Sequence, residues 1–112
     1  MLGAIGPAIG IKAFHRMTNR LTDPEDHVRN DVLWALQFHR INEYPAETLL
    51  PVFVQGLSDT HEVARQNAIL GLVRLGTNAA PARSSIEKAL NDPDQGVSGW
   101  AKQWLNGQYL SN

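Results

Sequence analysis

The chain has 112 residues, of which 43% are hydrophobic and 19% are charged, with a formal net charge of −1 and no cysteine. This length suits one domain or about three short repeats, and the balanced charge gives no indication of binding to nucleic acid or anionic lipid. The lack of cysteine excludes disulfides, thiolate metal sites and a thiol nucleophile, and it fits a reducing cytoplasm, where we expect the protein to act.

The first predicted helix covers residues 7–21 and overlaps an apolar stretch, residues 1–14. This stretch has no basic leader, and glycines and a proline interrupt it before Lys12 ends it. A membrane-spanning helix needs about 20 consecutive apolar residues. We therefore expect the stretch to start the fold and to be neither an export signal nor a membrane anchor.

A segment that begins and ends with leucine occurs three times in the chain. The copies begin at Leu21, Leu57 and Leu90, so the offsets between them are 36 and 33 residues. A period in this range is typical of repeat arrays, in which each unit is one supersecondary element that cannot bury its apolar face alone. The sequence therefore predicts stacked units of similar structure.

Apolar residues recur every four positions on both sides of an aspartate in each copy, a spacing that lines one face of a helix. Each unit is therefore predicted to be a pair of helices. Asp23-Pro24 and Asp92-Pro93 are expected to cap the second helix of their pairs. Pro51 is expected to kink the third helix, and Asn106-Gly107 to end the sixth. The predicted helices run near residues 7–21, 24–40, 45–57, 60–75, 79–90 and 93–106, in repeat units of about 7–40, 45–75 and 79–106 within a single domain, 1–112.

The first copy has the pattern L-x-D-P, followed by V-R and by an alanine and leucine, which resembles the short bacterial HEAT repeat first labelled in phycobilisome lyases. The third copy departs from this pattern at Ser84, Ser98 and Trp104, as is common in the end unit of an array. The resemblance implies an all-α, right-handed α-α superhelix (solenoid) of three HEAT-like hairpins, with the second helices along a concave surface. The residues that carry it are Leu21, Asp23, Pro24, Val28, Arg29, Val32, Ala35 and Leu36.

Recurring aspartates and arginines are the residues that come closest to suggesting catalysis. Asp23 with Arg29 and Asp59 with Arg65 recur at a six-residue offset. An active site is needed once, whereas a packing device is needed in every unit, so we interpret them as a ladder between neighbouring units. The four histidines lack metal-site spacing, and no nucleophile elbow or phosphate loop occurs. We predict no enzymatic activity, no cofactor and no bound metal.

The second helices carry another stripe of residues outside the buried columns. Trp34 and Leu70 share one column of this stripe, where side by side they would form an apolar strip. An apolar patch with a polar rim is typical of a binding surface, but both residues could instead pack between neighbouring helices. Phe38 is expected to pack, and Trp100 and Trp104 are expected to close the free flank of the end unit, with a dock for a partner as the alternative. The predicted partner-binding residues are Trp34, Leu70, Arg74, Asn67, Asp31 and Gln103.

The sequence thus predicts a non-catalytic protein–protein interaction module, or scaffold, that binds a protein partner on its concave face and has no nucleic-acid or membrane partner. The alternatives are a HEAT-like DNA glycosylase, an accessory protein of a pigment lyase, or a structural fragment of a longer repeat array, with self-association left open. A glycosylase of this kind holds DNA in a basic groove, which a net charge of −1 does not favour.

Overall fold

Six α-helices form the described part of the computed structural model, residues 6–109. No strand occurs in this range, and the predicted all-α fold class is confirmed. Residues 1–5, which belong to the apolar stretch expected to start the fold, lie outside the described range. The helices are α1 (Gly6–Thr18), α2 (Asp26–Trp34), α3 (Ala46–Gly56), α4 (Glu62–Leu75), α5 (Arg83–Ala89) and α6 (Gln95–Leu105).

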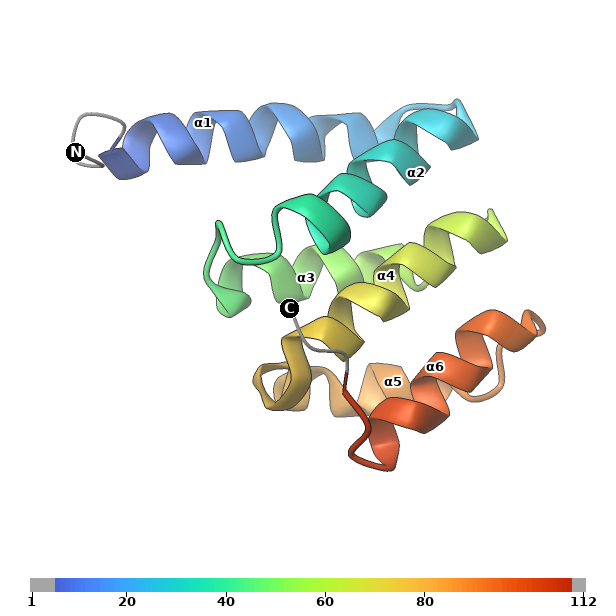
Figure 1. Ribbon diagram of the computed structural model, residues 1–112. Coiled ribbons are helices and arrows are strands. Elements are labelled where there is room, and N and C mark those ends of the chain that lie inside the picture. Colours follow the sequence, from blue (N-terminus) through green and yellow to red (C-terminus); the bar gives the residue numbers. More distant parts are fainter. Residues whose placement is uncertain (1–5, 110–112) are drawn as a thin grey trace.

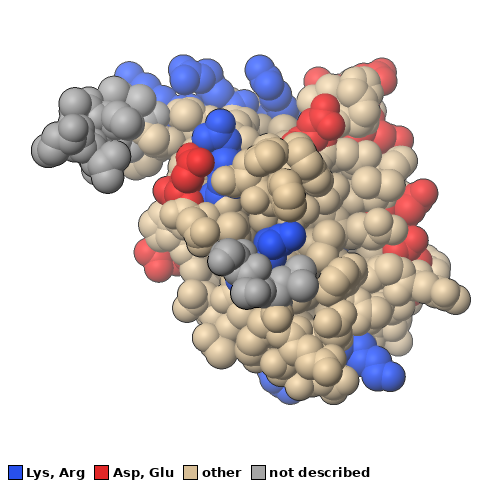
Figure 2. Space-filling model, viewed as in Figure 1, with Lys and Arg blue, Asp and Glu red and all other residues tan. Residues whose placement is uncertain are grey.

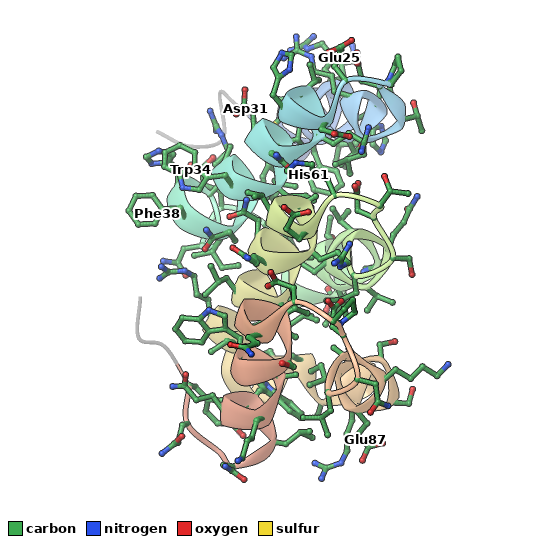
Figure 3. The ribbon with its side chains drawn as sticks, turned by 90° about the vertical axis from the view of Figure 1, so that its right-hand side faces the viewer. Glu25, Asp31, Trp34, Phe38, His61 and Glu87 are labelled. Atoms are coloured by element: carbon green, nitrogen blue, oxygen red, sulfur yellow. The ribbon has the colours of Figure 1, made fainter. Side chains whose placement is uncertain are left out.

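The helices stack as three successive hairpins (Figure 1). Seen from the side, α2, α4 and α6 form one row, and α1, α3 and α5 form the other (Figure 3). The most extensive packing is that of α4 against α3, α6 and α2. The middle hairpin is therefore covered on both flanks, whereas the first and third hairpins each have one flank with no neighbouring hairpin.

The apolar columns that recur in the repeats form the core. Ala64, Ala68 and Leu72 lie four residues apart on α4 and are fully buried. Leu49 and Phe53 of α3 are also fully buried and belong to the same cluster. Burial of one large apolar side chain stabilises a fold by about 1.5–3 kcal/mol, so these columns are the main source of cohesion between the hairpins.

Shorter helical segments join the α-helices, namely 3₁₀ turns at Asn19–Thr22 and Gly76–Ala82 and a π-helical segment at Ala35–His39. The turn at Gly76–Ala82 corrects the predicted fifth helix, which begins at Arg83 and not near residue 79. Pro81 has no N–H for an α-helical hydrogen bond, which favours the 3₁₀ turn. The other predicted helices agree with the structure once the segments that continue α1 and α2 are included, and α3 runs through Pro51.

The prediction that Asp23 and Asp92 cap helices is wrong. Helices α2 and α6 begin three residues later than these aspartates, after Glu25 and Asp94. Oδ1 of Asp23 accepts the N–H of Glu25 at 2.9 Å, and Oδ1 of Asp92 accepts that of Asp94 at 2.9 Å. An aspartate side chain readily bonds the N–H two residues later, so it forms a turn here. A later residue then occupies the N-cap position. Asp59 makes the same bond, so all three copies share one turn.

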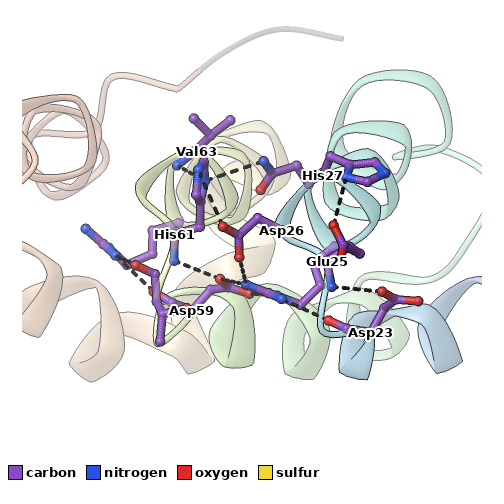
Figure 4. A network of polar contacts seen from close by, with 11 residues as sticks. Asp23, Glu25, Asp26, His27, Asp59, His61 and Val63 are labelled. Carbon is purple, nitrogen blue, oxygen red and sulfur yellow. Dashed lines mark hydrogen bonds and ion pairs between the residues drawn. The ribbon is translucent and has the colours of Figure 1, made fainter.

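Arginines of one hairpin bind the aspartates of the next. Arg29 donates from Nε and Nη2 to the carboxylate of Asp59, at 2.8 and 3.0 Å, while its Nη1 donates to the carbonyl of Asp23 at 2.9 Å (Figure 4). Arg65 repeats this arrangement with Asp92, at 2.8 and 3.2 Å. The predicted ladder between neighbouring units is confirmed, and its regularity identifies these charged residues as packing devices.

The first rung of the ladder is largely shielded from water, since the side chains of Arg29 and Asp59 expose only 11% and 12% of their surface. Hydrogen bonds from the Arg29 guanidinium hold the pKa of the Asp59 carboxyl below its ordinary value, and the N–H of His61 lowers it further. The carboxylates of Asp59 and Asp26 in turn raise the pKa of Arg29. A bidentate pair of this kind is both strong and directional, so it fixes how the first two hairpins stack.

Asn106 and Gly107 end α6, as predicted. Gly107 has a φ of +77°, a left-handed conformation that glycine adopts at little cost. The N–H of Gln108 bonds the carbonyl of Gln103, and that of Gly107 bonds the carbonyl of Trp104, both at 2.9 Å. These two bonds define a Schellman motif, which satisfies carbonyls that the helix end would otherwise leave unpaired.

Trp104 is buried, as expected of a packing residue, with 4% of its surface exposed. Its indole Nε1 donates to the carbonyl of Gly76 at 2.8 Å, which ties α6 to the end of α4. Trp104→Phe keeps most of the apolar contact but leaves this buried carbonyl without its donor, so we expect a loss of about 1–2 kcal/mol in the free energy of unfolding.

Urea denaturation followed by circular dichroism measures the effect of Trp104→Phe. Trp100→Phe is the matched control, because Trp100 is only partly buried and makes no comparable hydrogen bond in the described range. Equal losses for the two variants would show that the bond to Gly76 contributes nothing specific.

Candidate protein-binding surface

Two large aromatic side chains lie exposed where α2 continues into the π-helical segment. Trp34 exposes 45% of its surface and Phe38 exposes 53%. Their rings are stacked, with centroids 5.3 Å apart and an interplanar angle of 20°. Both rings also contact His39 edge-on, at 4.6 and 5.0 Å between centroids. We call Trp34, Phe38 and His39 the aromatic cluster; Figure 3 shows Trp34 and Phe38 projecting from the same side of the molecule.

The aromatic cluster is connected to the next hairpin through Arg74 of α4. The Arg74 guanidinium carbon lies 5.5 Å from the centroid of the Phe38 ring, a distance that suits a cation–π interaction. Arg74 Nε also donates to Oε1 of Gln37 at 2.8 Å. These two contacts hold the cation beside the exposed ring, so Arg74 lies at the edge of the cluster.

Asn67 does not lie on the rim where the sequence placed it. Only 7% of its surface is exposed, and its Oδ1 accepts a hydrogen bond from Gln37 Nε2 at 3.2 Å. The reason is that the π-helical segment after α2 covers this part of α4, so a polar residue there must find a partner inside the stack. Asn67 therefore supports the surface from beneath, by positioning Gln37, which in turn receives Arg74.

Gln37 is the residue of this region that sequence reasoning missed, and it is 97% buried. A signal was present, because Gln37 shares its repeat position with Val73, which is fully buried in the core. A polar residue in an otherwise apolar column requires a buried partner. Asn67, thirty residues later, is that partner.

The expectation that Phe38 packs between helices is wrong, because more than half of its surface is exposed. Phe38 lies in the π-helical segment that follows α2. The neighbouring Gln37 is buried against α4, whereas the Phe38 ring lies beside Arg74 and stays exposed. Trp100, in contrast, packs against the core as expected. Of the other predicted contact residues, Asp31 is exposed, whereas Leu70 and Gln103 are half-buried and do not belong to the aromatic cluster.

Two negative findings concern only residues 6–109. No group of three or more histidine, aspartate or glutamate side chains is arranged to hold a metal ion in this range. Within the same range, no helix has both the length and the apolar content that crossing a membrane requires.

Hairpins joined by a repeating arginine–aspartate ladder define an α-helical repeat protein. Residues 15–106 match the family model described as HEAT repeats, so the chain belongs to the HEAT repeat family. No curated protein and no solved structure matches the chain. HEAT repeats are commonly protein-interaction scaffolds, and the family is typically non-catalytic.

Proposed function

We propose that this chain is a non-catalytic protein-interaction module whose contact surface is centred on Trp34 and Phe38, with Arg74 at its edge. The observation that carries the proposal is the stacked pair of large aromatic rings, each about half exposed to water. Tryptophan, tyrosine and arginine are the most frequent anchors of protein interfaces, and a partner that covers these rings would remove a large apolar area from water.

Several features support a surface that is prepared for contact. Arg74 is held by Gln37 and lies against the Phe38 ring, so less side-chain freedom is lost when a partner binds. The π-helical segment at Ala35–His39 is of a kind that often occurs at functional sites. The proposal keeps Asp31, which is exposed, and Leu70 and Gln103, which are half-buried, as further candidate contact residues.

Replacing Trp34 with alanine tests the proposal. The wild-type chain is used to capture its partner from the native host, and the purified partner is then titrated calorimetrically against purified variants. Trp34→Ala is expected to weaken binding by about 2 kcal/mol, or roughly thirtyfold, as for an interface anchor. The thermal midpoint should stay close to that of the wild type, because the ring contributes little to the core.

Val63→Ala is the matched control for this titration. Val63 is an apolar residue on α4 that exposes 39% of its surface and lies outside the aromatic cluster, so its removal should leave affinity unchanged. The proposal fails if Trp34→Ala lowers the thermal midpoint while the folded fraction binds the partner with wild-type affinity, since Trp34 would then be a packing residue.

A further inference from the structure

The first hairpin has an uncovered flank that contains a groove. The groove lies between α1 and α2, has a volume of about 440 Å³, and is lined by Met17, Arg20, Asp23, Val28, Asp31 and Val32, among others. Basic side chains follow α1, and acidic side chains gather beside them where α2 begins (Figure 2). The flank is thus apolar at its centre and carries charges of both signs.

The same flank of the second hairpin shows how such a face is covered. Three residues, spaced four apart on α2 and the π-helical segment that continues it, contact this flank of the second hairpin. Arg29 binds the carboxylate of Asp59. Leu33 lies against Gly56, where a Cβ atom would be 3.3 Å from both Leu33 methyl carbons. Gln37 donates to Asn67 at 3.2 Å. A helix stripe of residues i, i+4 and i+8 therefore recognises this face.

The 36-residue offset assigns the matching residues on the first hairpin. Asp23 corresponds to Asp59 and forms the same turn, but its carboxylate pairs with no cation among residues 6–109. Val28 corresponds to the fully buried Ala64, yet it remains partly exposed. An arginine acceptor and an apolar centre are therefore in place without a covering helix.

The other two contact positions are changed in a consistent way. Arg20 occupies the position of Gly56, so an aliphatic side chain like Leu33 would meet a cation there instead of a glycine with no side chain. Asp31 occupies the position of Asn67 and can still accept a hydrogen bond. The face thus presents an anion, a cation and an anion to the three positions of an incoming stripe.

A second copy of this chain, stacked head to tail, does not fit this face. In the third hairpin the stripe reads Ser98, Lys102 and Asn106. Ser98 is too short to pair with Asp23, and Lys102 would be placed against Arg20, where two like charges repel. This mismatch disfavours head-to-tail association through this face and favours a partner with a different stripe.

We propose that the groove between α1 and α2 binds a helix of a second protein that carries an arginine, a carboxylate four residues later and a hydrogen-bond donor after another four. The arginine pairs with Asp23, the carboxylate with Arg20 and the donor with Asp31. The groove contains no residue of the aromatic cluster and shares only Asp31 with the surface proposed above, so it goes beyond that function and would give the molecule a second binding site.

The third hairpin can be converted into such a helix to test the proposal. The variant D23K/S98R/K102E is called the donor. Its S98R and K102E substitutions supply the arginine and the carboxylate on α6, and D23K blocks its own groove. The wild-type chain is the acceptor, and sedimentation velocity measures the affinity of the mixture. We expect a one-to-one complex that is at least tenfold weaker with acceptor D23A and with acceptor R20E.

A charge exchange provides the matched control. Donor D23K/S98R retains Lys102 and should prefer acceptor R20E over the wild-type acceptor, which reverses the order seen with the first donor. If D23K/S98R/K102E does not fold, as judged by circular dichroism, donor D23K/S98R with acceptor R20E tests the same face. The proposal is overturned if no donor binds, or if binding does not depend on Asp23 and Arg20.

Discussion

Gly71→Ala is expected to destabilise the fold by about 3 kcal/mol, although alanine is normally the better helix former by about 1 kcal/mol. Gly71 lies within α4 against Phe53 of α3, and Phe53 is fully buried. A Cβ atom at Gly71 would lie 2.6 Å from Cε2 of the Phe53 ring and overlap Cζ as well. Because the ring is enclosed, it cannot move aside without displacing its neighbours. Urea denaturation of the purified variant measures the loss.

Two further variants show whether the ring is the cause. Gly99→Ala, in α6, places a methyl group where no atom lies within 4 Å apart from its chain neighbours and its own helix backbone, so it should stabilise the fold by up to about 1 kcal/mol through helix propensity alone. Phe53→Leu should relieve part of the loss in the Gly71→Ala background, so that the two changes together cost less than their sum. A stabilising effect of Gly71→Ala similar to that of Gly99→Ala would contradict the packing seen between α3 and α4.

The repeat explains why the fold could be predicted. Three copies with apolar residues every four positions predict helix pairs and their core columns, and the structure buries Ala64, Ala68 and Leu72 accordingly. The predicted helix caps were wrong at Asp23 and Asp92, because an aspartate before proline suits both a cap and a turn. Only the position of the following helix decides between them, and spacing alone does not give that position to within three residues.

The candidate surface was harder to predict, because exposure depends on which flank of a residue has a neighbour. Trp34 was identified from its column, and the structure leaves it half exposed. Asn67, expected on the rim, is buried against Gln37 of the π-helical segment, and Phe38, expected to pack, is exposed. A helical stripe gives the direction of a side chain but not which segment of the neighbouring hairpin covers it.

Asp59→Ala is expected to destabilise the fold by about 2 kcal/mol, because Arg29 then loses the carboxylate that receives two of its hydrogen bonds. Asp23→Ala is the matched control. Asp23 holds the same turn through the N–H of Glu25, but it does not receive an arginine from a preceding hairpin in residues 6–109. Removal of the Asp23 carboxylate should therefore lower the free energy of unfolding by clearly less. Equal losses for the two variants, measured by urea denaturation at neutral pH, would mean that the turn and not the ion pair accounts for the effect.

The ion pair between Arg29 and Asp59 should also make the stability that Asp59 contributes depend on pH. The Arg29 guanidinium keeps the pKa of Asp59 below its ordinary value in the folded protein, whereas in the unfolded chain the carboxyl titrates near its ordinary pKa of about 4. The stability contributed by ionised Asp59 is therefore complete above about pH 4 and is lost as the pH falls through the folded pKa.

Asp59→Asn retains an acceptor for the N–H of His61 but has no charge to titrate. The gap in unfolding free energy between the wild type and Asp59→Asn should be constant from neutral pH to about pH 5 and should narrow below pH 4. A gap that widens on acidification would show that the carboxyl is protonated more readily in the folded state, which the bidentate contact with Arg29 does not allow.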